Sequence, residues 1–154
     1  MMRRFFKFII LRIQSSSWLH SKKIRPQLLR LTGMKIGKSH IGEQVIFDSL
    51  YPENIEIGDY SAITMRCVIL THFVEVAEKT EQNKGGRIFV SGKVIIGDNV
   101  FIGAHTLICK PVVIGNDCII AAGSVIVKDI PAGEIWGGVP AKFLKRRPEY
   151  EKNR

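Results

Sequence analysis

The sequence predicts an all-β solenoid, in which short parallel strands coil into a prism of triangular cross-section. The main observation is a series of β-branched residues at intervals of six: Val90, Ile96, Ile102, Ile108, Ile114, Ile120 and Ile126. Neither a helix, with a period of about 3.6, nor a half-buried strand, with a period of about 2, requires this interval. Gly follows the series at 97, 103 and 115, and Ala follows it at 121, so a tight turn can follow each strand. Three such units would form one coil, with the branched side chains pointing inward.

The 154 residues are enough for one domain with a single core, and they divide into three segments. Residues 1–33 are expected to be a short helical segment, because apolar residues recur at helical spacing, Pro26 stands near a helix start and Gly33 provides a stop. Residues 34–130 carry the repeat. Residues 131–154 form an exit punctuated by Gly and Pro and a basic C-terminal tail.

The interval of six breaks once inside the repeat. Ile57, Ile63 and Ile69 keep the spacing, but the interval from Ile69 to Val90 is not a multiple of six. The stretch 73–89 is polar and has no period. We expect it to be a loop that leaves the prism at a corner, and long loops in compact repeats usually serve function.

The net charge of +9 is concentrated at the two ends of the chain. Residues 1–30 contain eight Lys or Arg and no acidic residue, whereas residues 31–140 contain nine basic and twelve acidic residues. Basic ends suit anionic partners such as phosphates or acidic lipids. No aromatic-flanked basic motif favours nucleic acid, so none is expected as a partner. Two interpretations of the N-terminal segment remain open: a helix on an anionic membrane surface, or a cap on the open end of the prism.

The cysteines and the absence of a spanning segment indicate a cytoplasmic protein. Cys67, Cys109 and Cys118 form no CxxC pair and are odd in number, which favours a reducing compartment. No apolar run reaches the length of about 18 residues that a membrane-spanning helix needs. Lys7 and Arg12 interrupt the apolar start, so export is not expected. A location at the inner membrane surface would follow if the N-terminal segment binds lipid.

Residues 94–146, "VIIGDNVFIGAHTLICKPVVIGNDCIIAAGSVIVKDIPAGEIWGGVPAKFLKR", resemble the hexapeptide-repeat acyltransferases. The resemblance covers about 34–147 and is closest to the branch that O-acetylates sugars, capsule or lipopolysaccharide, with the galactoside and maltose acetyltransferases. The repeat alone indicates a fold, whereas the ending "GSVIVKDIP…GVPAK" is typical of acetyl-CoA users. The resemblance implies a left-handed parallel β-helix, a homotrimer with active sites between neighbouring prisms, and transfer of acetyl from acetyl-CoA to a hydroxyl.

Two of the four histidines are candidates for chemistry. His72 and His105 each follow an inward Ile by three residues, which points to a prism corner. If 73–89 adds no side to the prism, Ile69 and Ile102 share a face, and the two histidines stack about 4.8 Å apart. A hydroxyl nucleophile needs a base, and His suits this role at neutral pH. The resemblance favours His72, which ends "ILTH" before the long stretch, as the catalytic base.

His105 is the alternative base, and it is otherwise expected to line the substrate pocket. The alternative role for His72 is to anchor the loop. His20 and His40 are expected to be structural or exposed. A basic His usually needs a second group that fixes its tautomer, and Glu75, Asp59 or a backbone carbonyl could supply it.

Glu75 and Phe101 complete the expected substrate pocket. Phe101 precedes an inward Ile and therefore faces outward. It would wall the pocket or pack in a subunit interface.

The donor is expected along the corner of His105. Gly123 lies one coil, or three units of six, beyond His105, and small residues there would leave a groove for a pantetheine arm. The resemblance places further contacts at Ala104, Ala122 and Lys128, then at Lys142 and Lys145. Lysine ammonium groups suit the phosphates of CoA. A solvated tail is the alternative for the last two.

The sequence thus predicts an acetyl-CoA-dependent O-acetyltransferase that acts on a sugar or glycan precursor, as in polysaccharide biosynthesis, without a metal. Serine O-acetyltransferase is an alternative, although it resembles this chain only in the coil and carries a larger N-terminal helical domain than the segment 1–33 allows. A zinc carbonic anhydrase would need three His ligands with one close pair, and even His20 and His40, the nearest two in the sequence, are far apart. A non-catalytic scaffold or sugar-binding module is the remaining alternative.

Overall fold

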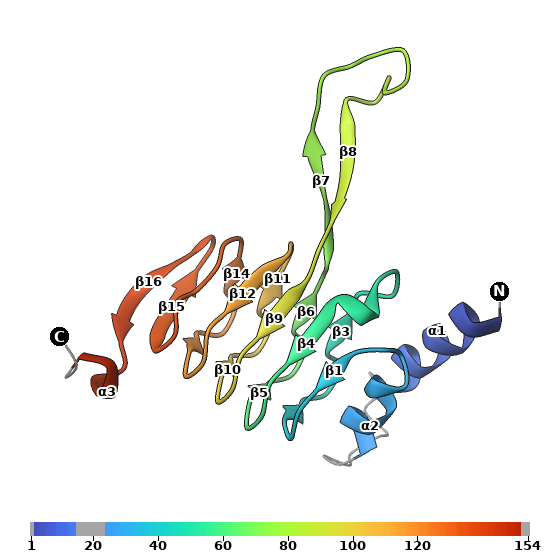
Figure 1. Cartoon of the computed structure of the whole chain (residues 1–154). Helices are drawn as coiled ribbons and strands as arrows, with labels where there is room; N and C mark the ends of the chain where they lie inside the picture. The colour runs from blue at the N-terminus through green and yellow to red at the C-terminus, as the bar shows by residue number, and fades with distance from the viewer. Residues whose placement is uncertain (1, 15–23, 152–154) are drawn as a thin grey trace.

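The computed structural model describes residues 2–14 and 24–151, which form a prism of short strands with two helices at its N-terminal end and a short one at its C-terminal end (Figure 1). The helices are α1 (Met2–Gln14), α2 (Ile24–Arg30), the 3-10 turn η1 (Pro52–Asn54) and α3 (Pro148–Glu151). The strands are β1 (Lys35–Ile36), β2 (His40–Ile41), β3 (Ile46–Phe47), β4 (Ile55–Ile57), β5 (Ala62–Ile63), β6 (Val68–Ile69), β7 (His72–Val76), β8 (Arg87–Ser91), β9 (Val94–Ile96), β10 (Phe101–Ile102), β11 (Leu107–Ile108), β12 (Val112–Ile114), β13 (Ile119–Ile120), β14 (Val125–Ile126), β15 (Glu134–Gly138) and β16 (Ala141–Arg146).

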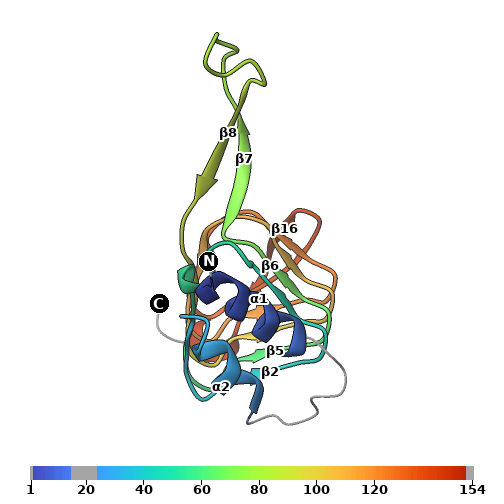
Figure 2. The same cartoon turned by 90° about the vertical axis from the view of Figure 1, so that its right-hand side faces the viewer.

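Three sheets form the sides of the prism, which has a triangular outline when viewed from its end (Figure 2). Sheet A has the order β1-β4-β9-β12, sheet B has β2-β5-β10-β13-β15-β16, and sheet C has β3-β6-β11-β14. Strands pair in parallel within the sheets, except that β16 is antiparallel to β15. Each successive coil therefore adds one strand to each sheet, as the repeat of six predicts.

The core is a set of isoleucine columns, one behind each sheet. Ile96, Ile102 and Ile108 are each 1% exposed and belong to sheets A, B and C, so they point to a common interior as predicted. Their equivalents in the flanking coils pair with them in register and are also buried: Ile57, Ile63, Ile69, Ile114, Ile120 and Ile126. Each such side chain stabilises the fold by about 1.5–3 kcal/mol.

Left-handed backbone conformations turn the chain at two of the three edges. At the edge between sheets A and B they occur at Tyr60, Asn99, Asp117 and Gly133, and at the edge between B and C they occur at Gln44, Arg66, His105 and Gly123. Each lies three residues after an inward aliphatic residue. Positive φ is uncommon outside Gly, Asn, Asp and His. Because Gln44, Tyr60 and Arg66 also adopt it here, the corner geometry recurs whichever side chain stands at the corner.

The register differs from the prediction at one point, because the chain leaves the prism after β6. Residues 72–91 include the antiparallel hairpin β7–β8, in which Val90 pairs with Phe73 rather than entering the core. Sheet A resumes only at β9, so Ile69 is in register with Ile108 and not with Ile102. The predicted stacking of His72 on His105 is therefore wrong, and the two histidines lie at different edges of the prism.

α1 and α2 cover the N-terminal end of the prism (Figure 2). Leu29 of α2 and Leu11 of α1 are buried within the same cluster as the isoleucine columns. Arg30 donates hydrogen bonds to the carbonyls of Ile36 and Gly37 at 2.7 and 2.8 Å, which ties α2 to the first coil. These contacts support the interpretation of the N-terminal segment as a cap, for the side of α1 and α2 that faces the prism. Among the described residues no helix is long and apolar enough to cross a membrane, and His20 lies outside those residues.

Candidate functional site

His72 forms a pair with Asp48 at the edge between sheets C and A. His72 is the first residue of β7, and Asp48 follows β3 one coil earlier. The Nδ1 atom of His72 lies 2.6 Å from Oδ2 of Asp48. The Asp48 side chain is only 1% exposed, whereas that of His72 is 26% exposed. A buried carboxylate thus holds an imidazole whose other side can meet solvent.

Asp48 is fixed by several donors besides His72. Its Oδ2 accepts hydrogen bonds from the amide and hydroxyl of Thr71 at 3.0 and 2.7 Å, and Oδ1 accepts one from the Leu50 amide at 2.8 Å. Burial alone raises the pKa of a carboxyl, but the bonds from Thr71, His72 and Leu50 outweigh it and lower the pKa of Asp48. The carboxylate is therefore ionised at neutral pH.

An ionised Asp48 fixes the tautomer of His72. Because the carboxylate can only accept, Nδ1 of His72 carries the proton and donates it to Asp48. The Nε2 atom then has the free lone pair of a base. This arrangement can take a proton from an acceptor hydroxyl and stabilise the resulting imidazolium.

A hollow lies beside the pair, between α1 and the first coil. It has a volume of about 400 Å³ and is lined by Lys7, Phe8, Ser49, Leu50, Tyr51 and Glu53. The ring of Tyr51 meets that of His72 edge to face, with centroids 6.2 Å apart. Lys7 and Glu53 form an ion pair at 2.8 Å within this lining. Tyr51 thus lines the hollow and also contacts His72, which is not itself part of the lining.

Neither predicted partner of His72 occupies the position of Asp48. Glu75 is exposed in β7 and, by strand alternation, lies on the opposite face of the hairpin from His72. Asp59 accepts a hydrogen bond from the Lys38 amide at 2.6 Å, at the edge between sheets A and B. Asp48 was missed because the coil that separates it from His72 contains the extra turn η1, so counting by three units of six does not place the two together. Its position directly after the inward Phe47 is the signal that could have found it.

The expected donor groove lies at a different edge, between sheets B and C. His105 is exposed there and has φ of 60°, and its amide donates to the carbonyl of Met65 at 3.1 Å. In the next coil the Gly123 amide donates to the carbonyl of Ala104 at 2.8 Å, and Ala122 is exposed. A Cβ added at Gly123 would meet nothing within 4 Å, so this edge is open beside small residues.

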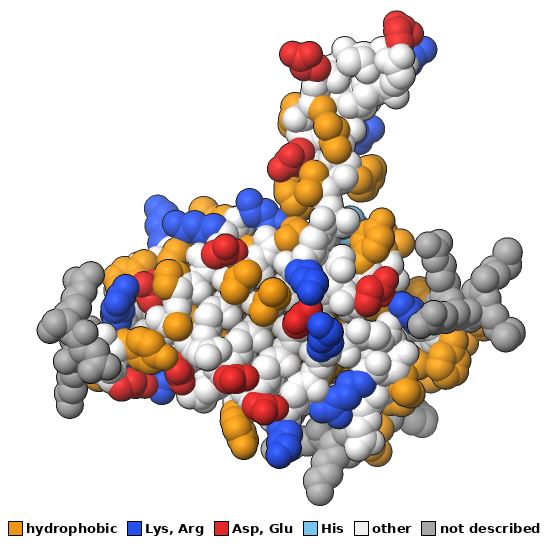
Figure 3. All heavy atoms as spheres, in the orientation of Figure 1, with side chains coloured by type: hydrophobic (Ala, Val, Ile, Leu, Met, Phe, Trp, Pro, Cys, Tyr) orange, Lys and Arg blue, Asp and Glu red, His pale blue; other side chains and the backbone are white. Residues whose placement is uncertain are grey.

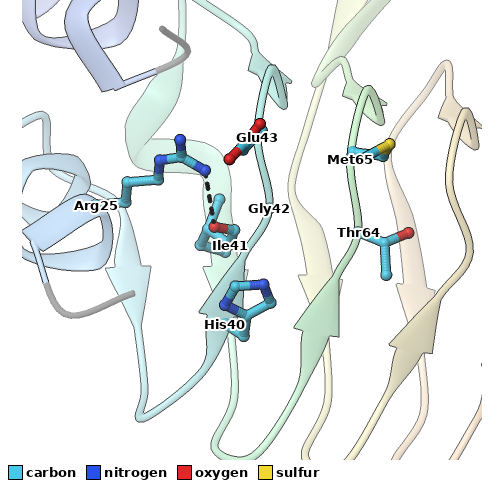
Figure 4. Close-up of a pocket in the computed structure, with 7 residues that line it drawn as sticks. All are labelled: Arg25, His40, Ile41, Gly42, Glu43, Thr64 and Met65. Atoms are coloured by element: carbon cyan, nitrogen blue, oxygen red, sulfur yellow. Dashed lines mark hydrogen bonds between the residues drawn. The ribbon is translucent and has the colours of Figure 1, made fainter. Parts of the chain in front are cut away.

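A second hollow continues the same edge toward the N-terminal end (Figure 4). It has a volume of about 440 Å³ and is lined by Arg25, His40, Ile41, Gly42, Glu43, Thr64 and Met65. Met65 occupies the position of Ala104 in the preceding coil, because both precede a left-handed corner residue. This hollow therefore extends the expected donor groove and is separate from the edge of His72.

The predicted lysines lie toward the C-terminal end of the prism, where basic side chains gather over β16 (Figure 3). The Nζ atom of Lys128 sits 4.8 Å from the ring centroid of Trp136. Trp136 is buried in register with Ile120 and donates to Glu134 at 2.8 Å. Lys142 and Lys145 are exposed on β16. All three ammonium groups can therefore meet an anionic ligand.

Phe101 lies on the outer face of sheet B, where it is 46% exposed. It pairs with Ala62 and Ile119 in the neighbouring coils. This position agrees with the expected outward orientation, but it is not at the edge of His72.

Six of the predicted site residues thus fall into two groups within one copy of the chain. His72 and Glu75 belong to the hairpin edge between sheets C and A. His105, Ala104, Ala122 and Gly123 belong to the edge between B and C. A single copy does not bring the two groups together.

Comparison with known proteins identifies the family. Residues 93–128 match the family described as "Bacterial transferase hexapeptide (six repeats)". Over 140 residues the chain is 31% identical to "Putative acetyltransferase YvoF" of Bacillus subtilis (strain 168), covering 90% of this chain and 71% of that protein. A stretch of 58 residues is 55% identical to a 2,3,4,5-tetrahydropyridine-2,6-dicarboxylate N-acetyltransferase of Staphylococcus carnosus (strain TM300). That stretch is 38% of this chain but only 24% of that enzyme.

Solved structures show the same architecture. A maltose O-acetyltransferase from Clostridium difficile 630 superposes with a TM-score of 0.67 at 24% identity, over 94% of this chain and 86% of that one. The N-acyltransferase AntD from Bacillus cereus, in complex with dTDP and coenzyme A, superposes with a TM-score of 0.62 at 25% identity, over 77% and 69%. Together with the relative that matches most of its length, these findings show that the chain belongs to the hexapeptide-repeat family of bacterial transferases, among its acetyltransferases.

Proposed function

We propose that the protein transfers acetyl from acetyl-CoA to a hydroxyl of a sugar or glycan precursor, with His72 as general base. The observation that carries the proposal is the buried, ionised Asp48 beside a partly exposed imidazole. The AntD structures that hold coenzyme A support the donor. Two of them also hold dTDP-4-amino-4,6-dideoxyglucose, which supports a sugar-like acceptor.

The proposed reaction is a direct attack of the acceptor oxygen on the thioester carbonyl. Nε2 of His72 takes the hydroxyl proton as the C–O bond forms, and Asp48 stabilises the imidazolium. When the C–S bond breaks, His72 returns the proton to the leaving sulfur. Glu75, Phe101 and His105 remain the proposed pocket residues.

The donor is proposed to lie along the edge between sheets B and C. Ala104, Ala122 and Gly123 would leave room for its pantetheine arm, and Lys128, Lys142 and Lys145 would pair with its phosphates. The separation of this edge from His72 supports an assembly of more than one copy, and the proposed assembly is a homotrimer of left-handed prisms. In it the hairpin edge of one copy would face the donor edge of its neighbour. The three cysteines are free thiols, which suits the proposed cytoplasmic location.

Substitution of His72 tests the proposal. His72→Ala should lower kcat by about 10²–10⁴-fold, because the hydroxyl loses its base. The measurement is mass-spectrometric detection of acetylated product after incubation with acetyl-CoA and a panel of sugars. His105→Ala should change KM more than kcat.

Two results would contradict the proposal. Full turnover by His72→Ala would remove the general-base role. Failure of the wild-type chain to bind CoA in calorimetry would favour a non-catalytic scaffold. The panel should include amino sugars, because AntD is an N-acyltransferase.

A further inference from the structure

We infer that the outer face of α1 binds the surface of an anionic lipid bilayer. The helix is apolar on two opposite sides. One side is buried at Ile10 and Leu11, which are 5% and 7% exposed, and Leu11 belongs to the core cluster of the prism. The other side is exposed at Phe5, Phe6, Phe8, Ile9 and Ile13, with exposed fractions of 66%, 56%, 51%, 36% and 48%.

The exposed residues form a continuous surface. Phe5, Ile9 and Ile13 are four residues apart, so they lie above one another on one helix face. A helix that only caps the prism would carry polar residues there. Hydrophobic side chains are visible over this end of the molecule (Figure 3). The surface therefore has the composition of a docking face.

Charge selects a bilayer as the occupant rather than a second copy of the chain. The sequence of α1 contains Arg3, Arg4 and Arg12 besides Lys7, which is paired with Glu53, and it contains no acidic residue. A second copy docked on α1 would bring two such sets of positive charge together, and they would repel. An anionic lipid surface would instead attract each nearby Lys or Arg. Arg12, stacked over Phe8 at 5.8 Å, shows cation and aromatic side by side on the helix.

The helix can lie on a bilayer but cannot cross one. Its 13 residues span about 20 Å, compared with a hydrocarbon thickness of about 30 Å. An amphipathic helix of this kind buries its apolar face at the headgroup boundary. α1 would thus lie on the surface of the bilayer without crossing it.

The position of α1 relates this docking to the active site. Lys7 and Phe8 line the same hollow as Tyr51, whose ring contacts that of His72. A docked α1 would place this hollow beside the headgroups, where an acceptor carried by a lipid would be presented. This consequence rests on the proposed function, whereas bilayer binding itself does not.

Co-sedimentation of the full chain with vesicles tests the inference without any activity assay. The wild type should sediment with phosphatidylcholine vesicles that contain phosphatidylglycerol and much less with phosphatidylcholine alone. Phe5→Ser combined with Phe6→Ser should weaken binding about tenfold or more, because two aromatic side chains no longer leave water. High salt should weaken the wild-type binding further.

Phe89→Ser is the matched control, because Phe89 is 77% exposed but lies on the hairpin. It should bind vesicles as the wild type does. Ile9→Ser provides a second, milder variant if circular dichroism shows that the double variant is misfolded. Equal binding by wild type and folded α1 variants would overturn the inference. So would self-association of the wild type through α1 in the absence of vesicle binding.

Discussion

Asp48 decides which nitrogen of His72 can act as a base. Its Oδ2 accepts from His72 and twice from Thr71, so it has little freedom to turn away. Because the hydrogen bonds to a buried carboxylate are charge-assisted, they hold the imidazole more firmly than a neutral partner would. Asp48 is therefore a positioning residue for the proposed reaction.

Asp48→Asn should lower kcat by about 10²–10⁴-fold with little change in the KM for acetyl-CoA. An amide in this position can donate to Nδ1 of His72, which moves the imidazole proton to Nε2 and removes the basic lone pair. Steady-state kinetics with acetyl-CoA and the best acceptor would measure the effect. Asp59→Asn is the control, because Asp59 is held by a backbone amide at another edge and should leave kcat unchanged. A change in KM alone in Asp48→Asn would contradict the positioning role.

Asp48 should also make stability depend on pH. Its folded pKa is lowered, so the stability it contributes is present above the unfolded value of about 3.9 and is lost as pH falls through the folded pKa. Urea unfolding of wild type and Asp48→Asn between pH 7 and about pH 3 would measure this. The wild type should lose more free energy of unfolding than the variant. Parallel pH profiles would show that the carboxylate contributes nothing.

At the residue scale the sequence predicted the candidate base but not its partner. His72 was placed by its motif and its position before a long stretch. Asp48 could not be placed by counting, because Phe47 is in register with Ile69, which lies further along the chain than three units of six. This early coil is longer than a regular one, and only the folded register shows which carboxylate reaches His72.

Within a single strand, one side chain faces the core and its neighbour faces the surface. In β10, Ile102 is 1% exposed and its neighbour Phe101 is 46% exposed. The two-residue strands are stabilised by this inward column and by hydrogen bonds to adjacent coils. Removal of an inward side chain should therefore lower the stability of the whole stack of coils.

Ile102→Ala should lower the free energy of unfolding by about 2–5 kcal/mol, because tightly packed columns cannot close the cavity. Phe101→Ala, in the same strand, should change it by less than about 0.5 kcal/mol if Phe101 is exposed in the assembly. Denaturant unfolding would compare the two. A large loss in Phe101→Ala would indicate that a neighbouring copy covers it, as the packed-interface alternative holds.

At the element scale the repeat of six predicted the coils, but it did not predict the structure of the segment that interrupts them. Period six was enough for β9 to β14, since every inward residue is aliphatic. The stretch 73–89 was expected to be a loop, yet His72–Val76 pairs with Arg87–Ser91 in a hairpin. Its strands mix polar and apolar residues on both faces, so alternation gave no clear signal. Because the hairpin was not predicted, Val90 was assigned to the inward series, although it pairs with Phe73.

The whole molecule separates the proposed base from the proposed donor groove. His72 stands at one edge of the triangle and Ala104 at another, and the rigid prism cannot bring them together. An assembly in which neighbouring copies face each other through these edges would complete the site. Function would then require more than one copy.

Mixed assemblies test this arrangement. His72→Ala chains and Lys142→Glu, Lys145→Glu chains should each be nearly inactive alone, because one lacks the base and the other repels the donor phosphates. Assembled together, they should regain part of the activity, since some edges would pair an intact base with an intact groove. The measurement is acetyl transfer after co-expression and purification of the mixed species. Absence of any recovery would place both halves in one copy.

A threefold assembly would also bring the α1 helices to one end. Prisms that run parallel around a common axis present their N-terminal ends on the same side. Three weak bilayer contacts would then act together, with an affinity well above that of one helix.

The hairpin begins and ends at one point of the prism, where the Gly92 amide donates to the carbonyl of Thr71 at 2.9 Å. The coils on either side keep their stacking across this junction, so the body of the molecule is insensitive to the length of the arm it carries. Arms of different size or sequence could be exchanged here while the donor-handling body stays the same. Relatives could then diverge in what they acetylate by altering one appendage, with no need to rebuild the coil.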